Sequence, residues 1–376
     1  TPKFATDGRL SGELRAQGNI FRYENFNGRV GQSDLAGSLS YDSARERPQL
    51  SGKVVSESLQ FSDLGAVVGS KQPHAQSDHV LPDVQFRVER WRAMDADVDF
   101  TGTRIAELPI RDVQTRIVMD NGVLTLKPLR FTIAGGRADS ELRLDSTAAP
   151  PAGSLTIAAR HLKLNAMFPS LEAMRASIGE VNGDLSLKGS GPSIAGILGD
   201  ADGEVKLLVD NGTISKAALE TAGLNLANIV ITRLFGDEQV RINCAASDFV
   251  VDNGVLNSRL FLFDTDDALI RVDGTVDLAH EQLDLTIHPD AKRLRLLSLR
   301  SPLHVTGTFK KVDVSVDKRS LFVRGGGAVA LGALAPVAAL VPLIAPSGET
   351  QNACAGVVSQ MRMRATPQAS APAKKT

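Results

Sequence analysis

Aromatic residues are scarce in this chain, which has a single tryptophan, Trp91, among 376 residues. An excess of either charge is also missing, because the basic and acidic side chains nearly cancel to a formal net charge of −1. Proteins that bind nucleic acid need a positive surface, and those that stack bases also need aromatic platforms. We therefore expect no nucleic-acid partner.

Catalytic and nucleotide-binding motifs are absent as well. None of the six histidines lies in an HExxH or CxxC context, and no serine occupies a nucleophile elbow. The glycine-rich stretch 189–196 lacks the Gly-Lys-Ser/Thr ending of a phosphate loop, and the stretch 325–332 lacks the flanking pattern of a dinucleotide site. The sequence therefore predicts no enzyme activity, no cofactor and no metal site.

Cysteine occurs only twice, at Cys244 and Cys354, and this spacing excludes a CxxC metal or redox motif. The two thiols are either separately buried, as cysteines often are, or joined in one disulfide that closes a long loop. The second alternative requires an oxidising compartment.

What the chain has in abundance is period-two alternation of apolar and polar residues. Residues 248–278 show it most clearly. A hairpin signal at Asn253–Gly254 is followed by the apolar run 260–263 and then by strict alternation over 270–278. Alternation of this kind gives a sheet one apolar and one charged face. The aspartates Asp95, Asp97 and Asp99 fit the charged face better than a calcium site, and the acidic turn at 264–267 is interpreted as a turn.

A sequence motif, an Asn-Gly turn followed by an apolar strand, recurs near residues 121, 211 and 253. A further Asn-Gly turn is predicted at 27–28. About 16 candidate strands would make a sheet on the order of 75 Å long, which must curl. We therefore predict a mainly β fold: a long, curled, antiparallel, repeat-built sheet, shaped like a groove or taco, with a few short helices.

Three sections are expected along the chain: an N-terminal β section at 1–70, a central β section at 71–165 and a C-terminal β section at 166–360. Other expected features are a linker or exposed loop at 69–82, a strand from residue 84, short helices within 168–180 and 215–235, an apolar helix at 325–346, and a disordered tail at 361–376.

A strongly basic stretch precedes the apolar segment. Residues 291–324 contain nine basic and two acidic side chains, and residues 325–347 contain no charge. Such a stretch is either a solvated face or a surface for anionic lipid head groups. The candidate head-group residues are Lys292, Arg293, Arg295, Arg300, Lys310 and Lys311.

The order of these motifs resembles the AsmA family. The resemblance rests on residues 242–289 and 299–317, the Gly/Ala/Leu/Pro segment ending at Pro346, Cys354, and the upstream stretches 189–214 and 33–64. It implies an envelope protein of Gram-negative bacteria, related to the bridge-like lipid transfer proteins TamB and YhdP. It also implies a periplasmic location and an inner-membrane anchor through an N-terminal helix, which we expect to precede this chain because the chain starts without Met inside a β pattern.

The resemblance further implies a Cys244–Cys354 disulfide and a hydrophobic groove that holds phospholipid acyl chains. The expected partners are phospholipids and the surface of the inner membrane, with the outer membrane surface left as an open alternative. The oligomeric state also stays open. The candidate groove residues are Leu260, Leu262, Ile270, Val272, Val276, Leu283, Leu285, Val305, Val312 and Val314.

Two functional hypotheses follow. The first is a conduit or carrier of phospholipid that supports outer-membrane biogenesis. The second is a scaffold or regulator of outer-membrane protein assembly, or of protein targeting to the membrane, that carries no lipid. They differ in whether the apolar face is an open groove or a closed core, which alternation alone does not decide. A carbohydrate-binding or adhesive β protein would need paired carboxylates or aromatic platforms, and the sequence shows neither.

Overall fold

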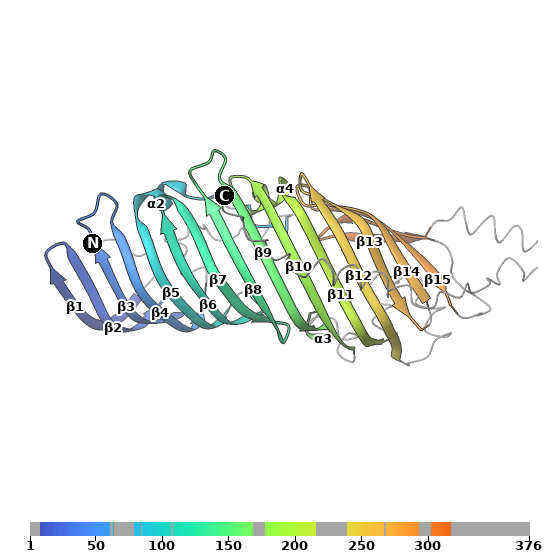
Figure 1. The fold of residues 1–376 in the computed structure, drawn as a ribbon, viewed down its shortest axis with the longest axis horizontal. Helices are drawn as coiled ribbons and strands as arrows, with labels where there is room; N and C mark the ends of the chain where they lie inside the picture. The colour runs from blue at the N-terminus through green and yellow to red at the C-terminus, as the bar shows by residue number, and fades with distance from the viewer. Residues whose placement is uncertain are drawn as a thin grey trace, which may run out of the picture.

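The computed structural model describes residues 8–60, 63, 79–83, 85–106, 108–167, 177–215, 239–266, 268–292 and 302–316. They form one 17-stranded sheet in which each strand pairs with the next strand along the chain (Figure 1). The strands are β1 (Gly8–Gln17), β2 (Ile20–Val30), β3 (Ser33–Asp42), β4 (Gln49–Leu59), β5 (Asp95–Ile105), β6 (Ile110–Asp120), β7 (Val123–Ile133), β8 (Gly136–Asp145), β9 (Ala152–Lys163), β10 (Ile178–Ser190), β11 (Asp202–Ser215), β12 (Gln239–Asp252), β13 (Val255–Thr265), β14 (Ala268–Asp277), β15 (Gln282–Ala291), β16 (Leu303–Thr308) and β17 (Val312–Val316).

The predicted long, curled β-sheet is confirmed, and the prediction that it is antiparallel throughout is wrong at one place. Strands β4 and β5 pair in parallel, with Gln49 opposite Asp95 and Leu59 opposite Ile105. A parallel pair needs a connection that returns to the starting edge of the sheet. Residues 60–94 form that connection, and they include the linker predicted at 69–82, of which 79–82 are described and form no helix or strand.

Bulges near the middle of the strands explain the curl. The pairing register shifts between Tyr23 and Phe26 in β2, between Leu126 and Leu129 in β7, and in several other strands. Asn25, beside the first of these shifts, has a φ of 50°. A bulge adds a residue to one strand and bends it, so bulges repeated along the sheet turn long strands into a trough.

Of the five Asn-Gly pairs in the sequence, two form the predicted turns. Asn121–Gly122 joins β6 to β7 and Asn253–Gly254 joins β12 to β13, and both residues of each pair have positive φ. The turns predicted from the pairs near 27 and 211 are wrong, because both pairs lie inside strands. At Gly28 the glycine serves a close approach instead, since a Cβ there would lie 1.9 Å from the carbonyl oxygen of Arg9.

Within the described ranges, three short helices lie at the ends of strands: α2 (Val88–Ala93), α3 (Leu164–Met167) and α4 (Ile194–Gly199). The strand predicted from residue 84 is wrong where it is described, because Val88 begins α2 and the ring of Phe86 packs on the buried Trp91. The helix predicted to end at Gly179 is wrong at that end, because β10 already begins at Ile178.

The other predicted helices, within 215–235 and at 325–346, and the tail 361–376 lie outside the described residues except for Ser215, which ends β11. The division into three sections stays a prediction. The sheet itself continues across both section boundaries, where β4 pairs with β5 and β9 pairs with β10.

Helix α4 packs closely against the backbone at two glycines, Gly189 and Gly254, which we call the glycine floor. A Cβ at Gly189 would lie 2.3 Å from the carbonyl oxygen of Ile197, and one at Gly254 would lie 2.3 Å from that of Gly199. Ser193 caps the helix by accepting a 3.0 Å hydrogen bond from the amide of Gly196. We call the strand ends that carry α2 and α4 the α4 rim, which is the upper edge of the sheet in Figure 1.

The glycine floor yields a testable prediction. We expect Gly254→Ala to lower the free energy of unfolding by about 2–4 kcal/mol, because its Cβ collides with backbone that cannot rotate away and its φ is 75°. Gly18→Ala is the matched control: Gly18 also has a positive φ, but nothing lies within 4 Å of its Cβ position. Equal losses in denaturant titrations of the two variants would contradict the close seating of α4.

Candidate hydrophobic groove

One continuous line of apolar side chains and glycines crosses all 17 strands. We call it the apolar row, and each member lies directly opposite the next in the pairing register. The register continues in the same way through the C-terminal strands. From β1 to β17 its members are Leu14, Tyr23, Leu39, Gly52, Val98, Ile117, Leu126, Leu142, Leu155, Leu187, Gly203, Val251, Leu256, Val276, Leu283, Gly307 and Val312.

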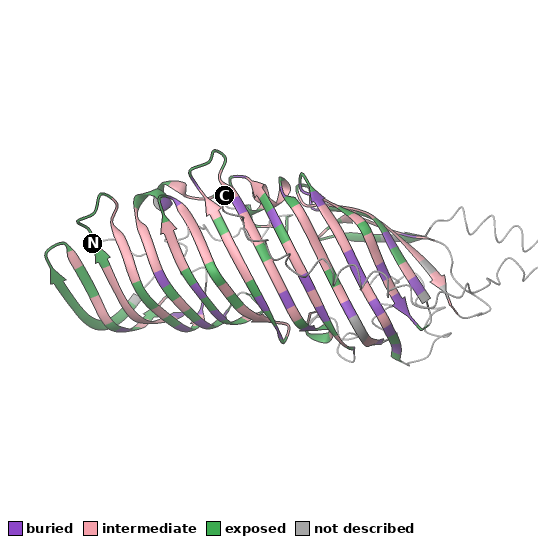
Figure 2. Cartoon of the chain, viewed as in Figure 1, coloured by how far each residue is buried: buried purple, intermediate pink, exposed green. Residues whose placement is uncertain are grey.

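Most of this row is only partly shielded from solvent. Val98, Leu187 and Val251 are buried, most other members are half-buried, and the ends are open, with Leu14 70% and Val312 50% exposed. Figure 2 shows half-buried residues along most of the sheet, with buried positions more frequent towards the C-terminal strands. A closed core would bury nearly all of these side chains. In the described part of the chain the apolar face is therefore partly open.

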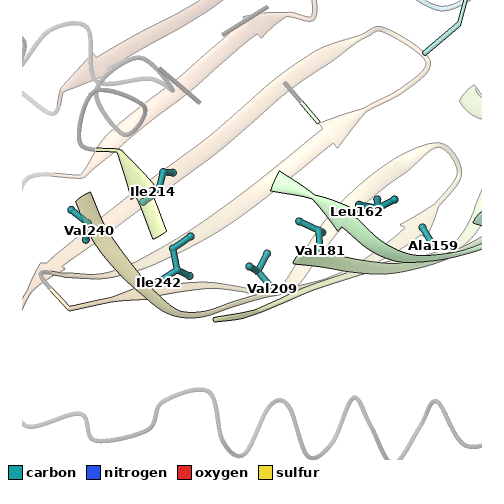
Figure 3. Packing of buried hydrophobic residues seen from close by; sticks show 7 residues of the cluster. All are labelled: Ala159, Leu162, Val181, Val209, Ile214, Val240 and Ile242. Carbon is teal, nitrogen blue, oxygen red and sulfur yellow. The ribbon is translucent and has the colours of Figure 1, made fainter. Parts of the chain in front are cut away.

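Buried clusters line the two long edges of this face. Near the edge opposite the α4 rim, seven residues from β9 to β12 form the largest one: Ala159, Leu162, Val181, Val209, Ile214, Val240 and Ile242. In Figure 3 these side chains stand on the concave side of the bent strands. At the α4 rim, Leu198 of α4 packs on a cluster formed by Leu187, Ala201 and Val251. Around β9–β12 the concave face is therefore buried near both of its edges.

The opposite, convex face carries charged pairs that hold neighbouring strands. Arg116 donates two 2.7 Å hydrogen bonds to the carboxylate of Asp97, which holds the pKa of Asp97 below its ordinary value. Arg47 binds Asp95 at 2.6 Å, and Arg160 binds Asp184 at 2.7 Å. Asp95 and Asp97 therefore bind arginines, in line with a solvated outer face. Among the described residues, no group of three or more histidine, cysteine or acidic side chains could hold a metal ion.

The sequence-predicted groove residues divide between the two faces. Ile270, Val272, Val276, Leu283, Leu285, Val305 and Val312 belong to the concave face, and Val314 lies opposite Val305 in the register. Leu260 and Leu262 do not, because the register of β13 shifts after Asn257 and places Leu262 opposite Arg271. The bulge transfers these two leucines to the convex face, and no local pattern in the sequence marks it.

Only three of the six candidate head-group residues are described. Lys292 forms an ion pair with the buried Asp264, so its charge is used inside the protein. Lys310 and Lys311 are exposed in the turn between β16 and β17. Arg293, Arg295 and Arg300 lie outside the described residues. The structure thus does not bring the basic candidates together on one described surface.

Cys244 lies in β12 on the convex face, where it is 3% exposed, and it is disulfide-bonded. Its predicted partner, Cys354, lies outside the described residues, so the pairing between the two stays a prediction.

Sequence reasoning missed a segment that runs along the α4 rim. We call residues 79–83 and 85–94 the rim segment. Its Val80 and Leu81 amides donate hydrogen bonds of 2.7–2.9 Å to the carboxylate of Glu281 in the β14–β15 turn. Farther along the segment, the backbone amide of Phe86 donates a hydrogen bond to the carbonyl oxygen of Pro192, just before α4. The segment thus links turns that are far apart in the sequence.

Glu281 is the anchor of this segment, with a side chain only 4% exposed. Burial raises its pKa, but the hydrogen bonds from Val80 and Leu81 and the charges of His79 and Lys310 outweigh burial and hold the pKa below its ordinary value. The carboxylate is therefore ionised at neutral pH and fixes one end of the rim segment. About 200 residues separate the partners, which is why no local motif reveals the contact.

None of the helices in the described ranges combines the length and apolar character needed to cross a bilayer. The arrangement as a whole offers a long, two-faced trough with an apolar, partly open concave side and an ion-paired convex side.

Comparison with known proteins identifies the family of the chain. The family model described as "AsmA family" matches residues 1–261. The chain is 42% identical over 384 aligned residues to the AsmA family protein YhjG of Escherichia coli strain K12, an alignment that covers 96% of this chain and 56% of that protein. The chain therefore spans little more than half the length of this relative, and no solved structure matches it. By the extent of these matches the chain belongs to the AsmA family, a family of envelope-associated proteins.

Proposed function

We propose that this chain holds or conducts phospholipid acyl chains along its concave face and supports outer-membrane biogenesis, without catalysing a reaction. In this proposal it works in the periplasm as part of a protein anchored to the inner membrane. The observation that carries the proposal is the apolar row, unbroken in register from Leu14 to Val312 and mostly half-buried. At about 4.8 Å per strand the row is roughly 77 Å long, longer than the ~30 Å hydrocarbon core of a bilayer.

Acyl chains suit this surface for simple energetic reasons. Each methylene group that leaves water gains about 0.8 kcal/mol, and the head group can stay in water at the open side of the trough. The apolar row forms a mainly aliphatic floor, with Tyr23 as its one aromatic member. A polar or charged group in this floor would need to be desolvated by the bound chain, at a cost of several kcal/mol.

The test compares two neighbouring residues of β9 that point to opposite faces. Leu155 belongs to the apolar row, whereas Thr156 lies opposite Glu141 on the exposed convex face. We expect native mass spectrometry of the purified chain to show bound phospholipid, and Leu155→Asp to remove the part of it that lies across β9. Thr156→Asp, which adds the same charge, should retain it. A lipid-free wild-type chain that takes up none from labelled vesicles would contradict the proposal.

The scaffold hypothesis has one observation in its favour. Around β9–β12 buried clusters occupy both edges of the concave face, and Val251 is only 2% exposed. If the wild-type chain is lipid-free, this buried section would be typical of the whole sheet, and the sheet would serve outer-membrane protein assembly or protein targeting to the membrane without carrying lipid.

A further inference from the structure

A second apolar surface lies on the convex face, where charged side chains otherwise prevail. We call it the outer patch, and it consists of Cys244, Ala246, Leu260, Leu262 and Leu269 on β12, β13 and β14. The register places them together, because Leu262 lies opposite Ala246 and both Cys244 and Leu269 lie opposite Asp264.

The outer patch is covered. Leu262 is 6% and Leu269 5% exposed, values typical of a protein core. Among the described residues, Leu260 is the one partly buried apolar side chain that packs on the cluster of Cys244, Leu262 and Leu269. A single leucine at the margin cannot shield three side chains that project from the same face of a sheet. Another apolar segment must therefore lie over them.

The disulfide identifies that segment. Cys244 is disulfide-bonded, and the sequence contains one other cysteine, Cys354. A disulfide holds the two Cα atoms within about 7 Å, so its second cysteine must reach the outer patch. The 37 residues between Val316 and Cys354 can span the five strand spacings from β17 back to β12, roughly 24 Å.

The residues before Cys354 also have the right chemistry. Residues 325–347 are uncharged and rich in Ala, Leu, Val and Pro, so they can cover an aliphatic patch without burying a charge. We propose that the chain's own segment 325–354 docks on the outer patch and is locked there by a Cys244–Cys354 disulfide. In this proposal the apolar segment covers the outer patch, an arrangement that we call the clasp, and it does not enter a membrane while the disulfide is intact.

Formation of the Cys244–Cys354 disulfide is a two-electron oxidation. The two thiols lose two electrons and two protons as the sulfur–sulfur bond forms, and a thiol–disulfide exchange protein in its disulfide form accepts them and leaves as a dithiol. The proposal therefore places the folded chain in an oxidising compartment.

The pairing is tested first. Light and heavy isotope-labelled chains are mixed before folding and digested without reduction, and the disulfide-linked peptides are identified by mass. We expect one linked pair, containing Cys244 and Cys354, with both peptides carrying the same label. Mixed labels would show that Cys244 bonds to a second copy of the chain, which would overturn the proposal.

Docking is tested by hydrogen exchange of residues 325–353. We expect these amides to exchange at least tenfold more slowly in the wild-type chain than in Cys354→Ser, which leaves the sheet intact. The double variant Leu262→Ser with Leu269→Ser should also speed their exchange, whereas Asp273→Ser, an exposed position of β14, should not. Fast exchange in the oxidised wild-type chain would overturn the proposal.

The membrane is the competing occupant. Vesicles of phosphatidylethanolamine with phosphatidylglycerol should leave the exchange of 325–353 unchanged while the disulfide is intact. If vesicles instead slow exchange of this segment and speed exchange of β13 in the oxidised chain, the segment inserts into bilayers and the clasp is excluded.

Discussion

Replacing Glu281 by alanine is expected to free the rim segment at residues 79–83 and to speed amide exchange at Val80 and Leu81 roughly 30- to 700-fold. That range corresponds to a loss of about 2–4 kcal/mol, the net worth of two hydrogen bonds from backbone amides to a buried carboxylate. The distances of 2.7–2.9 Å are those of charge-assisted bonds. Residue-resolved hydrogen exchange measures the effect directly.

The matched control is another carboxylate in an ion pair. Glu180 binds His161 at 2.7 Å, but its side chain is 59% exposed. Exposed pairs contribute little, so Glu180→Ala should change the free energy of unfolding by less than about 1 kcal/mol. If Glu281→Ala leaves exchange at Val80 and Leu81 as slow as in the wild-type chain, the carboxylate is not the anchor of the rim segment.

The same anchor should respond to acid. Because folding lowers the pKa of Glu281, its contribution is fully present above its ordinary value near 4.5 and is lost as the pH falls through the lower value of the folded protein. Exchange at Val80 and Leu81, corrected for its intrinsic pH dependence, should therefore accelerate in that acidic range. Glu281→Gln, which cannot ionise, should remove this dependence.

Much of the fold can be predicted from the alternation of apolar and polar residues, and each exception has a physical cause. On β5, alternation correctly predicts that Asp95 and Asp97 lie on the face opposite to Val98, because period two sets the faces of a regular strand. The faces of Leu260 and Leu262 are predicted wrongly, because a one-residue bulge reverses the alternation without changing the composition of the strand. The parallel pairing of β4 and β5 is likewise not predictable from alternation, since period two is the same in parallel and antiparallel strands.

The features that shape the candidate groove depend on still longer-range contacts. Helix α4 is held by close backbone approach at Gly189 and Gly254, and Glu281 contacts a segment 200 residues earlier in the chain. The density of glycines between 189 and 203 is the one local signal of such an approach. The apolar face is therefore predictable from the sequence, whereas the buried clusters at its edges and the rim segment require the structure.

A charged barrier across the middle of the apolar row is expected to reduce phospholipid transfer between vesicles at least tenfold. Leu126 and Leu142 lie opposite each other on β7 and β8, so Leu126→Asp with Leu142→Asp places two carboxylates side by side in the trough. An acyl chain that passes this point must desolvate both, at a cost of several kcal/mol. Transfer of a fluorescent phospholipid from donor to acceptor vesicles measures the effect, and Thr125→Asp with Thr156→Asp adds the same charge on the convex face.

Bound lipid, counted by native mass spectrometry in the same samples, separates a conduit from a carrier. The barrier occupies two of the 17 strands, so the sections on either side keep most of their apolar surface and should retain most of their lipid. In a conduit, transfer per bound lipid must therefore collapse, because every molecule has to pass β7 and β8. In a carrier, lipid enters and leaves sideways, so transfer would fall only in proportion to the lipid bound. That second result would reject movement along the row while leaving lipid binding in place.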